Sequence, residues 1–403
     1  MNDRRLLLLT RSLRLFAYGG LSVILVFYLT ALEFTTAQVG LLLTLTLAGD
    51  TLVSLGLTTR ADRLGRRRML FIGALFMSAA GVLFAVTSNF ALLLFAGTIG
   101  IISPSGNEVG PFLPIEQAAL AHVVPASQRT PVFAWYTLAG SFATAVGSLA
   151  VGAVLTVLHA GGASPLQRYR LVLLLYAAIG LLLAACFTQL SPAVEVVDVQ
   201  RASPLGLGRS RSIVFRLAAL FAVDSFAGGF VVQSFAAYWF YLRFGVSPAS
   251  LGAIFFGANL LAGVSALLAS RLAARFGLVT TMVFTHLPSN VLLILVPLMP
   301  TLPLAILVLF ARFSISQMDV PTRQSYVMAV VGPEERSAAA GITGVARTTG
   351  AAIAPLFAGM LFSRPALINT PFFIAGTLKI VYDVMLYRGF RGVQPRPPRA
   401  GGV

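Results

Sequence analysis

Residues 113–124 read LPIEQAALAHVV, and residues 320–331 read VPTRQSYVMAVV. The two stretches lie 207 residues apart and share a proline, a glutamine and an apolar ending, but Glu116 in the first is replaced by Arg323 in the second. A charged side chain inside an apolar run of this kind is costly in a membrane and usually functional. The repeat therefore predicts a duplicated membrane segment in which one buried charge has changed its sign.

The duplication extends over the rest of the chain. AQVG ending at Gly40 matches ASLG ending at Gly252, 212 residues later. ADRLG ending at Gly65 matches AARFG ending at Gly277 with the same offset. The change of offset from 212 to 207 places extra residues of the first half around its fourth apolar run. Repeats that follow one another in the same order predict two parallel bundles, a layout of one large class of transporters whose substrate binds near the midplane.

The composition indicates a protein of the lipid bilayer. Hydrophobic residues make up 57% of the 403 residues, charged residues only 10%, and the mean hydropathy is +0.88, whereas a soluble domain carries about 25% charged residues. A membrane-spanning helix needs about 20 mainly apolar residues. Runs of that kind lie near 14–33, 37–59, 69–88, 90–124, 131–158, 170–188, 214–242, 249–274, 279–299, 303–330, 337–362 and 369–388. We therefore expect an all-α membrane protein whose twelve transmembrane helices form two pseudo-symmetric six-helix bundles.

Basic residues are distributed unevenly between the two predicted sides. With the N-terminus in the cytoplasm, the inner segments hold 21 arginines and the outer segments hold four, which is the bias that orients membrane proteins. This bias accounts for the net charge of +16 without a nucleic-acid partner. The longest polar segment, 189–213, predicts a cytoplasmic linker between an N-terminal bundle, 1–188, and a C-terminal bundle with a short cytoplasmic tail, 214–403. We expect a monomer in the cytoplasmic membrane with both termini in the cytoplasm.

The loop after the second predicted helix reads TTRADRLGRRRML, residues 58–70. It resembles the loop signature of the major facilitator superfamily, Gly-x-x-x-Asp-x-x-Gly-Arg followed by a basic residue, with Thr58 at the position of the first glycine. The matching residues are Asp62, Arg63, Gly65, Arg66 and Arg67. The resemblance implies a secondary transporter with a conformational latch at this loop, where Asp62 accepts hydrogen bonds from arginines or from a helix N-terminus. The alternative is that the loop serves only as a positive anchor on the inner side.

Antiporters of that family often carry Gly-x-x-x-Gly-Pro-x-x-Gly-Gly in the fifth helix. Here the fifth predicted helix reads ATAVGSLAVG, with Gly147 and Gly152 but with Ser148 where proline is usual. The eleventh reads GAAIAPLFAG, with Gly350 and Gly359. Because small residues at such spacing also let two helices approach closely, we expect close packing to be their role.

Ionisable and polar residues within the predicted spans define the candidate site. The residues expected along the substrate or proton pathway are Asp50, Glu108, Glu116, Asp224, Gln233, Asp319, Arg323 and Arg347. Asp50 is a candidate proton carrier, because a low-dielectric site favours the protonated carboxyl. Glu116 and Arg323 occupy matching positions, so they can pair across the two halves and close the inner part of the pathway. The alternative is pairing within each half, with Asp319 one helical turn from Arg323.

The segment SPSGNEVGPF, residues 103–112, interrupts the fourth predicted span. Its two prolines and two glycines are incompatible with a continuous helix, and non-helical backbone at membrane depth must line a cavity or be covered by protein. Because broken spans often mark substrate or ion sites, we expect a broken helix with such a site here. The alternative is an outer loop followed by a short span that starts near Phe112.

Motifs of enzymes and cofactors do not occur in the sequence. A Walker loop, a GxGxxG after a strand, HExxH and CxxC are all missing, and the single cysteine, Cys186, excludes an internal disulfide or a multi-cysteine metal site. We therefore predict no enzyme, no cofactor and no metal. The expected function is secondary active transport of a small organic solute by alternating access, coupled to protons, with efflux as the first expectation. Proton-coupled symport of an organic anion or zwitterion, and a non-transporting receptor or sensor on the same fold, are the alternatives.

Overall fold

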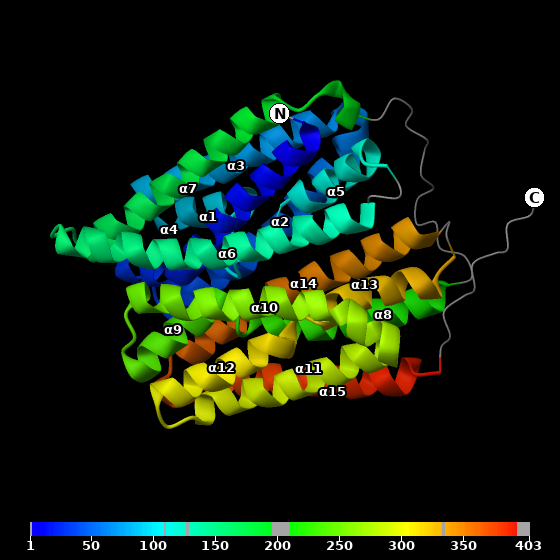
Figure 1. Ribbon diagram of the computed structural model, residues 1–403. Helices are drawn as coiled ribbons and strands as arrows, with labels where there is room; N and C mark the ends of the chain where they lie inside the picture. The colour runs from blue at the N-terminus through cyan, green and yellow to red at the C-terminus, as the bar shows by residue number, and fades with distance from the viewer. Residues whose placement is uncertain (1, 109, 126–128, 196–209, 333–334, 393–403) are drawn as a thin grey trace, which may run out of the picture. The chain divides into compact units, whose positions relative to one another are not determined.

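The protein is built from helices (Figure 1). The structure is a computed structural model, and it describes all residues except 1, 109, 126–128, 196–209, 333–334 and 393–403. Over this part of the chain no strand occurs. The α-helices are α1 (Asp3–Ala31), α2 (Thr36–Leu64), α3 (Arg66–Val86), α4 (Phe90–Ile99), α5 (Phe112–Val123), α6 (Arg129–Ala160), α7 (Pro165–Thr188), α8 (Arg211–Gly229), α9 (Gln233–Phe244), α10 (Pro248–Phe276), α11 (Leu278–Leu295), α12 (Leu302–Ser316), α13 (Asp319–Val330), α14 (Arg336–Phe362) and α15 (Thr370–Phe390).

These helices correspond to twelve membrane spans, because three spans consist of two consecutive helices each: α4 with α5, α8 with α9, and α12 with α13. Among the described residues, ten segments are long and apolar enough to cross a membrane. The remaining two spans are the α4–α5 pair and α15, which carries Lys379 and Asp383. The predicted fold of twelve transmembrane helices in two pseudo-symmetric six-helix bundles is confirmed.

The broken helix predicted in the fourth span is also confirmed. α4 ends at Ile99, α5 begins at Phe112, and the described residues between them are not helical. Gly106 and Gly110 adopt φ angles of 69° and 80°, which glycine tolerates without strain. The break is fixed from α2, where the carboxylate of Asp50 accepts a 2.6 Å hydrogen bond from the Gly110 N–H.

One compact unit of the molecule comprises residues 1–199, 229–263 and 352–371. Within it, α1 packs along α6 and α7, and α3 packs along α7. The approach of α1 to α6 depends on glycine, because a Cβ added to Gly147 would lie 1.9 Å from the carbonyl oxygen of Phe16. This contact supports close packing as the role of that glycine in the fifth span.

A second compact unit comprises residues 200–228, 264–351 and 372–403. In it, α11 packs against α12 and α13. Its apolar core draws on α8, α11, α13, α14 and α15 and includes Val214, Leu217, Phe221, Met282, Tyr326, Val330, Ala339, Tyr382 and Leu386. Gly350 of α14 lies against α8, where the carbonyl oxygen of Ala222 is 2.4 Å from an added Cβ. The eleventh span thus uses its glycine in the same way as the fifth.

The linker predicted at 189–213 lies partly outside the described residues, which resume at residue 210 after the gap at 196–209. Its first part contains a short 3-10 helix, Pro192–Val194, and is tied to the start of α1. The Ser191 N–H donates to Asp3 Oδ1 at 2.9 Å, and its hydroxyl donates to Oδ2 at 2.5 Å. The bundle boundaries at 188 and 214 stay a prediction.

Candidate functional site

A buried ion cluster joins α1 to α5 and to the break before it. The guanidinium group of Arg14 donates to both carboxylate oxygens of Glu116, at 2.9 and 2.8 Å, and to Glu108 Oε1 at 2.7 Å. Arg11, one turn earlier on α1, donates to Glu108 Oε2 at 2.7 Å. Arg14 and Glu116 are both fully buried. Because two cations meet two carboxylates, this cluster is electrically balanced.

Further contacts satisfy Glu116. The hydroxyl of Thr10 donates to Glu116 Oε1 at 3.0 Å, and the hydroxyl of Tyr136 on α6 donates to Oε2. Aromatic rings cover the cations, with Arg14 4.4 Å above the Phe112 ring and Arg11 above the Tyr136 ring. Buried carboxylates with this many donors are held firmly in place. The cluster therefore fixes α1, α5 and α6 relative to one another.

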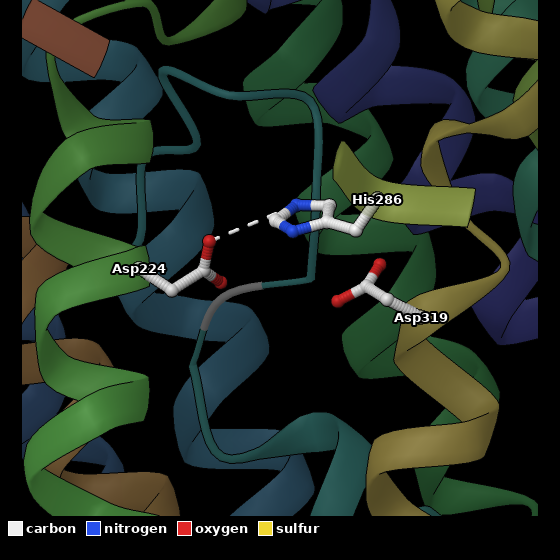
Figure 2. Close-up of side chains that lie close together, drawn as sticks. All are labelled: Asp224, His286 and Asp319. Atoms are coloured by element: carbon white, nitrogen blue, oxygen red, sulfur yellow. Dashed lines mark ion pairs between the residues drawn. The ribbon is translucent and has the colours of Figure 1, made fainter. Parts of the chain in front are cut away.

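A second buried ion cluster lies at mid-span in the other unit, around Asp224 of α8. Its carboxylate accepts a hydrogen bond from Lys379 Nζ at 2.5 Å and from Arg323 Nη1 at 3.0 Å. Arg323 Nη1 is also 3.3 Å from Asp319 Oδ2, one turn earlier on α13. The imidazole of His286 on α11 completes the group, with Nε2 3.7 Å from Asp224 Oδ1. Figure 2 shows the side chains of Asp224, His286 and Asp319 directed toward one another from these three helices.

His286 connects two carboxylates. Its Nδ1 is 2.8 Å from Asp383 Oδ1 on α15, while Nε2 faces Asp224. Asn290 donates to the other oxygen of Asp383 at 2.9 Å. Each ring nitrogen of the imidazole thus faces a carboxylate on a different helix.

Asp224, His286 and Asp319 each offer one ligand atom, and these atoms all lie within 4.8 Å of one another. The set is small enough to surround a metal ion. However, Lys379 and Arg323 already hold the same carboxylates, and their positive charges oppose a second cation at that point. The chemistry of the donor set therefore favours ion pairs and protons over a metal.

Each unit pairs a charge on the first helix of its half with a charge on the fourth span. In the first half Arg14 pairs with Glu116, and in the second Asp224 pairs with Arg323. Asp224 follows Arg14 by 210 residues, close to the repeat offsets of 207 and 212. The two pairs thus carry opposite signs in the two halves, although Asp224 lies at the exact offset of neither repeat. Pairing of Arg323 with Asp319 within one half, the alternative from the sequence, is confirmed, and the pair across the halves stays a prediction.

The other pathway candidates fall in different surroundings. Asp50 binds the Gly110 N–H, and no cation is described within ion-pair distance of it. Gln233, at the start of α9, donates to the Ser22 hydroxyl at 2.9 Å and accepts from Asn259 at 3.2 Å. Arg347 is half-buried at mid-helix in α14. These residues are not brought into either ion cluster by a described contact.

The predicted latch loop is held by a residue that the sequence did not point to. Glu195, at the end of the described linker segment, accepts from the backbone N–H of Arg66 at 2.7 Å and of Arg67 at 3.2 Å. The carboxylate thus caps the N-terminus of α3, where it also meets the favourable end of the helix dipole. Gly65, with φ of 99°, makes the turn before it. The Asp62 side chain, for which the latch was predicted, lies outside the described residues, so its role stays a prediction.

Two arginines were misplaced by the sequence. The 21 inner arginines counted from the sequence include Arg11 and Arg14, at the start of a first span expected from residue 14. α1 instead begins at Asp3, and both side chains are buried in the first ion cluster. The signal that points to Arg14 is its spacing to Asp224 together with the opposite signs of Glu116 and Arg323. Nothing local in the sequence marks Glu195 as the cap of α3.

The chain has twelve apolar spans, three of which are broken, and its buried ion clusters lie beside the breaks. These features define a multi-pass membrane protein of the transporter class. The profile of the Major Facilitator Superfamily matches residues 7–242 and 217–402. The chain belongs to this superfamily.

Relatives agree with this assignment. An uncharacterized membrane protein of Saccharomyces cerevisiae (strain ATCC 204508 / S288c), YJR124C, is 33% identical over 427 aligned positions that cover 98% of this chain and 95% of the yeast protein. A bacterial homolog to the human lysosomal transporter Spinster, in an inward-facing and occupied conformation, is similar with a TM-score of 0.76 and 16% identity over 98% of both chains. The nucleoside transporter NupG is similar with a TM-score of 0.73 and 15% identity, over 97% of this chain and 100% of its own. The human organic anion transporter MFSD10 is similar with a TM-score of 0.64 and 18% identity, over 96% of this chain and 100% of its own. At these identities the solved structures establish the fold.

Proposed function

We propose that this protein is a secondary active transporter that moves a small organic solute across the cytoplasmic membrane by alternating access, with protons as the coupling ion. The observation that carries the proposal is the Asp224 cluster, in which a carboxylate, an imidazole and two cations are buried at mid-span. Ionisable groups at that depth are expensive and mark proton and substrate pathways. Membership of a superfamily of transporters supports the same function and speaks against an enzyme.

The coupling step follows from the contacts of Asp224. While its carboxylate is ionised, it holds Lys379 and Arg323. A proton delivered through His286 neutralises the carboxylate and weakens both ion pairs, because a neutral acid no longer compensates a buried cation. The helices α8, α13 and α15 are then free to change their packing. Proton uptake and the conformational change are thereby linked at one residue.

Efflux by proton antiport is the proposed direction, and the basis is the family resemblance. Proton-coupled uptake of an organic anion or zwitterion is the second candidate, favoured by the charges of both signs in the clusters. The names of NupG and MFSD10 describe transport of nucleosides and organic anions by those proteins. We place both termini in the cytoplasm from the arginine bias and take the working unit to be a monomer.

Flux measurements in proteoliposomes test the proposal. A thermal-shift screen of small organic solutes against the purified protein first supplies a ligand, and its flux is then followed with a pH-sensitive dye inside the vesicles. We expect the ligand to dissipate an imposed pH gradient through the wild type, and Asp224→Asn to abolish proton movement. Glu33→Gln, at an exposed carboxylate outside both clusters, is the matched control and should behave as wild type.

Three results contradict parts of the proposal. Binding without flux by the wild type identifies a sensor. Flux that leaves the pH gradient intact removes protons as the coupling ion. Normal proton movement through Asp224→Asn removes that residue from the coupling step.

A further inference from the structure

Two arginines of the second unit lie at the middle of their spans without a described hydrogen bond or ion pair to a carboxylate. Arg312 is on α12 and Arg347 is on α14. The Nε atoms of both are buried and make no hydrogen bond, and no ion pair to a described carboxylate is formed. Arg347 is 11 residues from the start of α14 and 15 from its end, or about 16 and 22 Å at the helical rise of about 1.5 Å per residue. Neither membrane surface is therefore close to its guanidinium group.

The carboxylates in the neighbourhood are already committed. Asp224 is held by Lys379 and Arg323, and Asp319 also contacts Arg323. Asp383 is occupied by His286 and Asn290. Among the described residues at this level, and leaving His286 aside, four arginine and lysine side chains face three carboxylates. The unit thus holds more positive charge at mid-span than its own acids balance.

Electrostatic interactions, rather than hydrogen bonds or ion pairs, link the two arginines to the Asp224 cluster. Arg312 and Arg347 both interact with Asp224 and Asp319, and Arg347 is also repelled by Arg323, a like charge. Repulsion between two neighbouring guanidinium groups is costly at low dielectric unless an anion lies close to them. A missing anion is the simplest way to complete this group of charges.

Unused hydrogen-bond donors lie on the same elements. Ser316, one turn after Arg312 on the same face of α12, is 5% exposed, and its hydroxyl has no hydrogen bond. Arg323 also keeps its Nε without a partner. All of these unsatisfied side-chain atoms can donate, so the ligand that satisfies them must be an acceptor.

We infer that Arg312 and Arg347 bind the anionic group of an organic solute, a carboxylate or a phosphate, and that Ser316 donates to it. The inference rests on the proposed transport function and names its substrate class. A guanidinium group presents a planar pair of donors that matches both kinds of acid. An anion bound here compensates the excess positive charge, and its departure restores the repulsion that Arg347 meets from Arg323. Either direction of transport is compatible with this substrate class.

Binding measurements on the purified full chain in detergent test the inference. The probes are succinate, glutarate and phenylphosphonate at constant ionic strength, with dimethyl succinate as the uncharged counterpart of succinate and putrescine as a dication. We expect at least one dianion to raise the melting temperature of the wild type and the uncharged and cationic probes to have no effect. Arg312→Gln and Arg347→Gln should each raise the Kd of that dianion about 10- to 100-fold, the cost of a charge-assisted contact. Arg271→Gln, at an exposed arginine of α10, should leave it unchanged.

The melting temperature without ligand separates binding from a structural role. Because Arg347→Gln removes a charge that Arg323 repels, we expect the ligand-free variant to melt at or above the wild-type temperature. A lower melting temperature, unchanged affinity in both variants, or no response of the wild type to any of the three dianions overturns the inference. Transport with proton coupling that accepts only uncharged solutes would also overturn it, while leaving the proposed function intact.

Discussion

The strongest test of the first ion cluster is removal of Arg14. Its guanidinium group makes three hydrogen bonds of 2.7 to 2.9 Å, two to Glu116 and one to Glu108, in a position with no solvent access. Arg14→Met preserves much of the side-chain length and removes the charge. Glu116 then keeps only its two hydroxyl donors, and Glu108 keeps only Arg11. Breaking a buried ion pair by removing one partner costs about 3–5 kcal/mol, so we expect a loss of that size.

A double-mutant cycle separates the pair from its surroundings. Glu116→Gln leaves Arg14 with Glu108 and still able to donate to the amide oxygen, so its cost should be about 1–3 kcal/mol. In Arg14→Met/Glu116→Gln no carboxylate is left facing the lost arginine except Glu108. The double variant should therefore be more stable than the sum of the single losses by about 2 kcal/mol, within the range measured for close charge pairs.

Unfolding of the detergent-solubilised protein by denaturant provides the assay. Arg60→Met is the matched control, because Arg60 is exposed on α2 and its described hydrogen bond is to Gly56 of the same helix; its effect should stay within about 0.5 kcal/mol. If Arg14→Met does not fold, Arg14→Lys keeps the charge but loses the bidentate geometry and serves in the same cycle. Additive losses to within about 0.5 kcal/mol would refute the assignment of Arg14 as the partner of Glu116.

Three further changes test other parts of the structure. Gly147→Ala should destabilise the fold markedly, because its Cβ would lie 1.9 Å from a backbone oxygen of α1. The control Gly341→Ala, whose Cβ would have no atom within 4 Å, should be neutral or stabilising by up to about 1 kcal/mol in thermal unfolding. Equal effects of the two substitutions would contradict the packing of α1 against α6. Glu195→Gln should cost about 1 kcal/mol through the weakened cap of α3, and an unchanged melting temperature would show that the cap contributes nothing. Flux through Glu116→Arg/Arg323→Glu tests the pair across the halves: if the double swap recovers no transport lost in either single swap, that pair is wrong.

The break in the fourth span was predictable, because SPSGNEVGPF contains residues that forbid a helix. The breaks between α8 and α9 and between α12 and α13 were not. The first follows Gly228 and Gly229, and the second falls at Gln317 and Met318 ahead of Pro321. Isolated glycines and a proline in the first turn of a helix are tolerated in continuous spans as well. Only the packing of the folded chain decides these two cases.

The ion clusters show a different limit of prediction. The sequence identifies Glu116, Asp224, Asp319 and Arg323 as charges within spans, because each interrupts an apolar run. It gives no account of Glu195, which acts 129 residues away from Arg66 in the chain. A capping carboxylate in a polar linker looks like any other exposed acid until the helix that it caps is placed beside it.

The opposite signs of the buried charges in the two repeats have a physical explanation that involves both members of each ion pair. Suppose that the duplicated span gained Arg323 in place of a carboxylate while α8 kept an arginine where the first half has Arg14. Arg323 would then have been buried beside another cation. Such an arrangement costs several kcal/mol, and Asp224 at that position removes the cost. Because the signs are opposite on both helices, each unit contains a buried ion pair of its own. The same two sign changes therefore keep a buried ion pair in each half, whereas attraction between Glu116 and Arg323 across the halves stays a prediction.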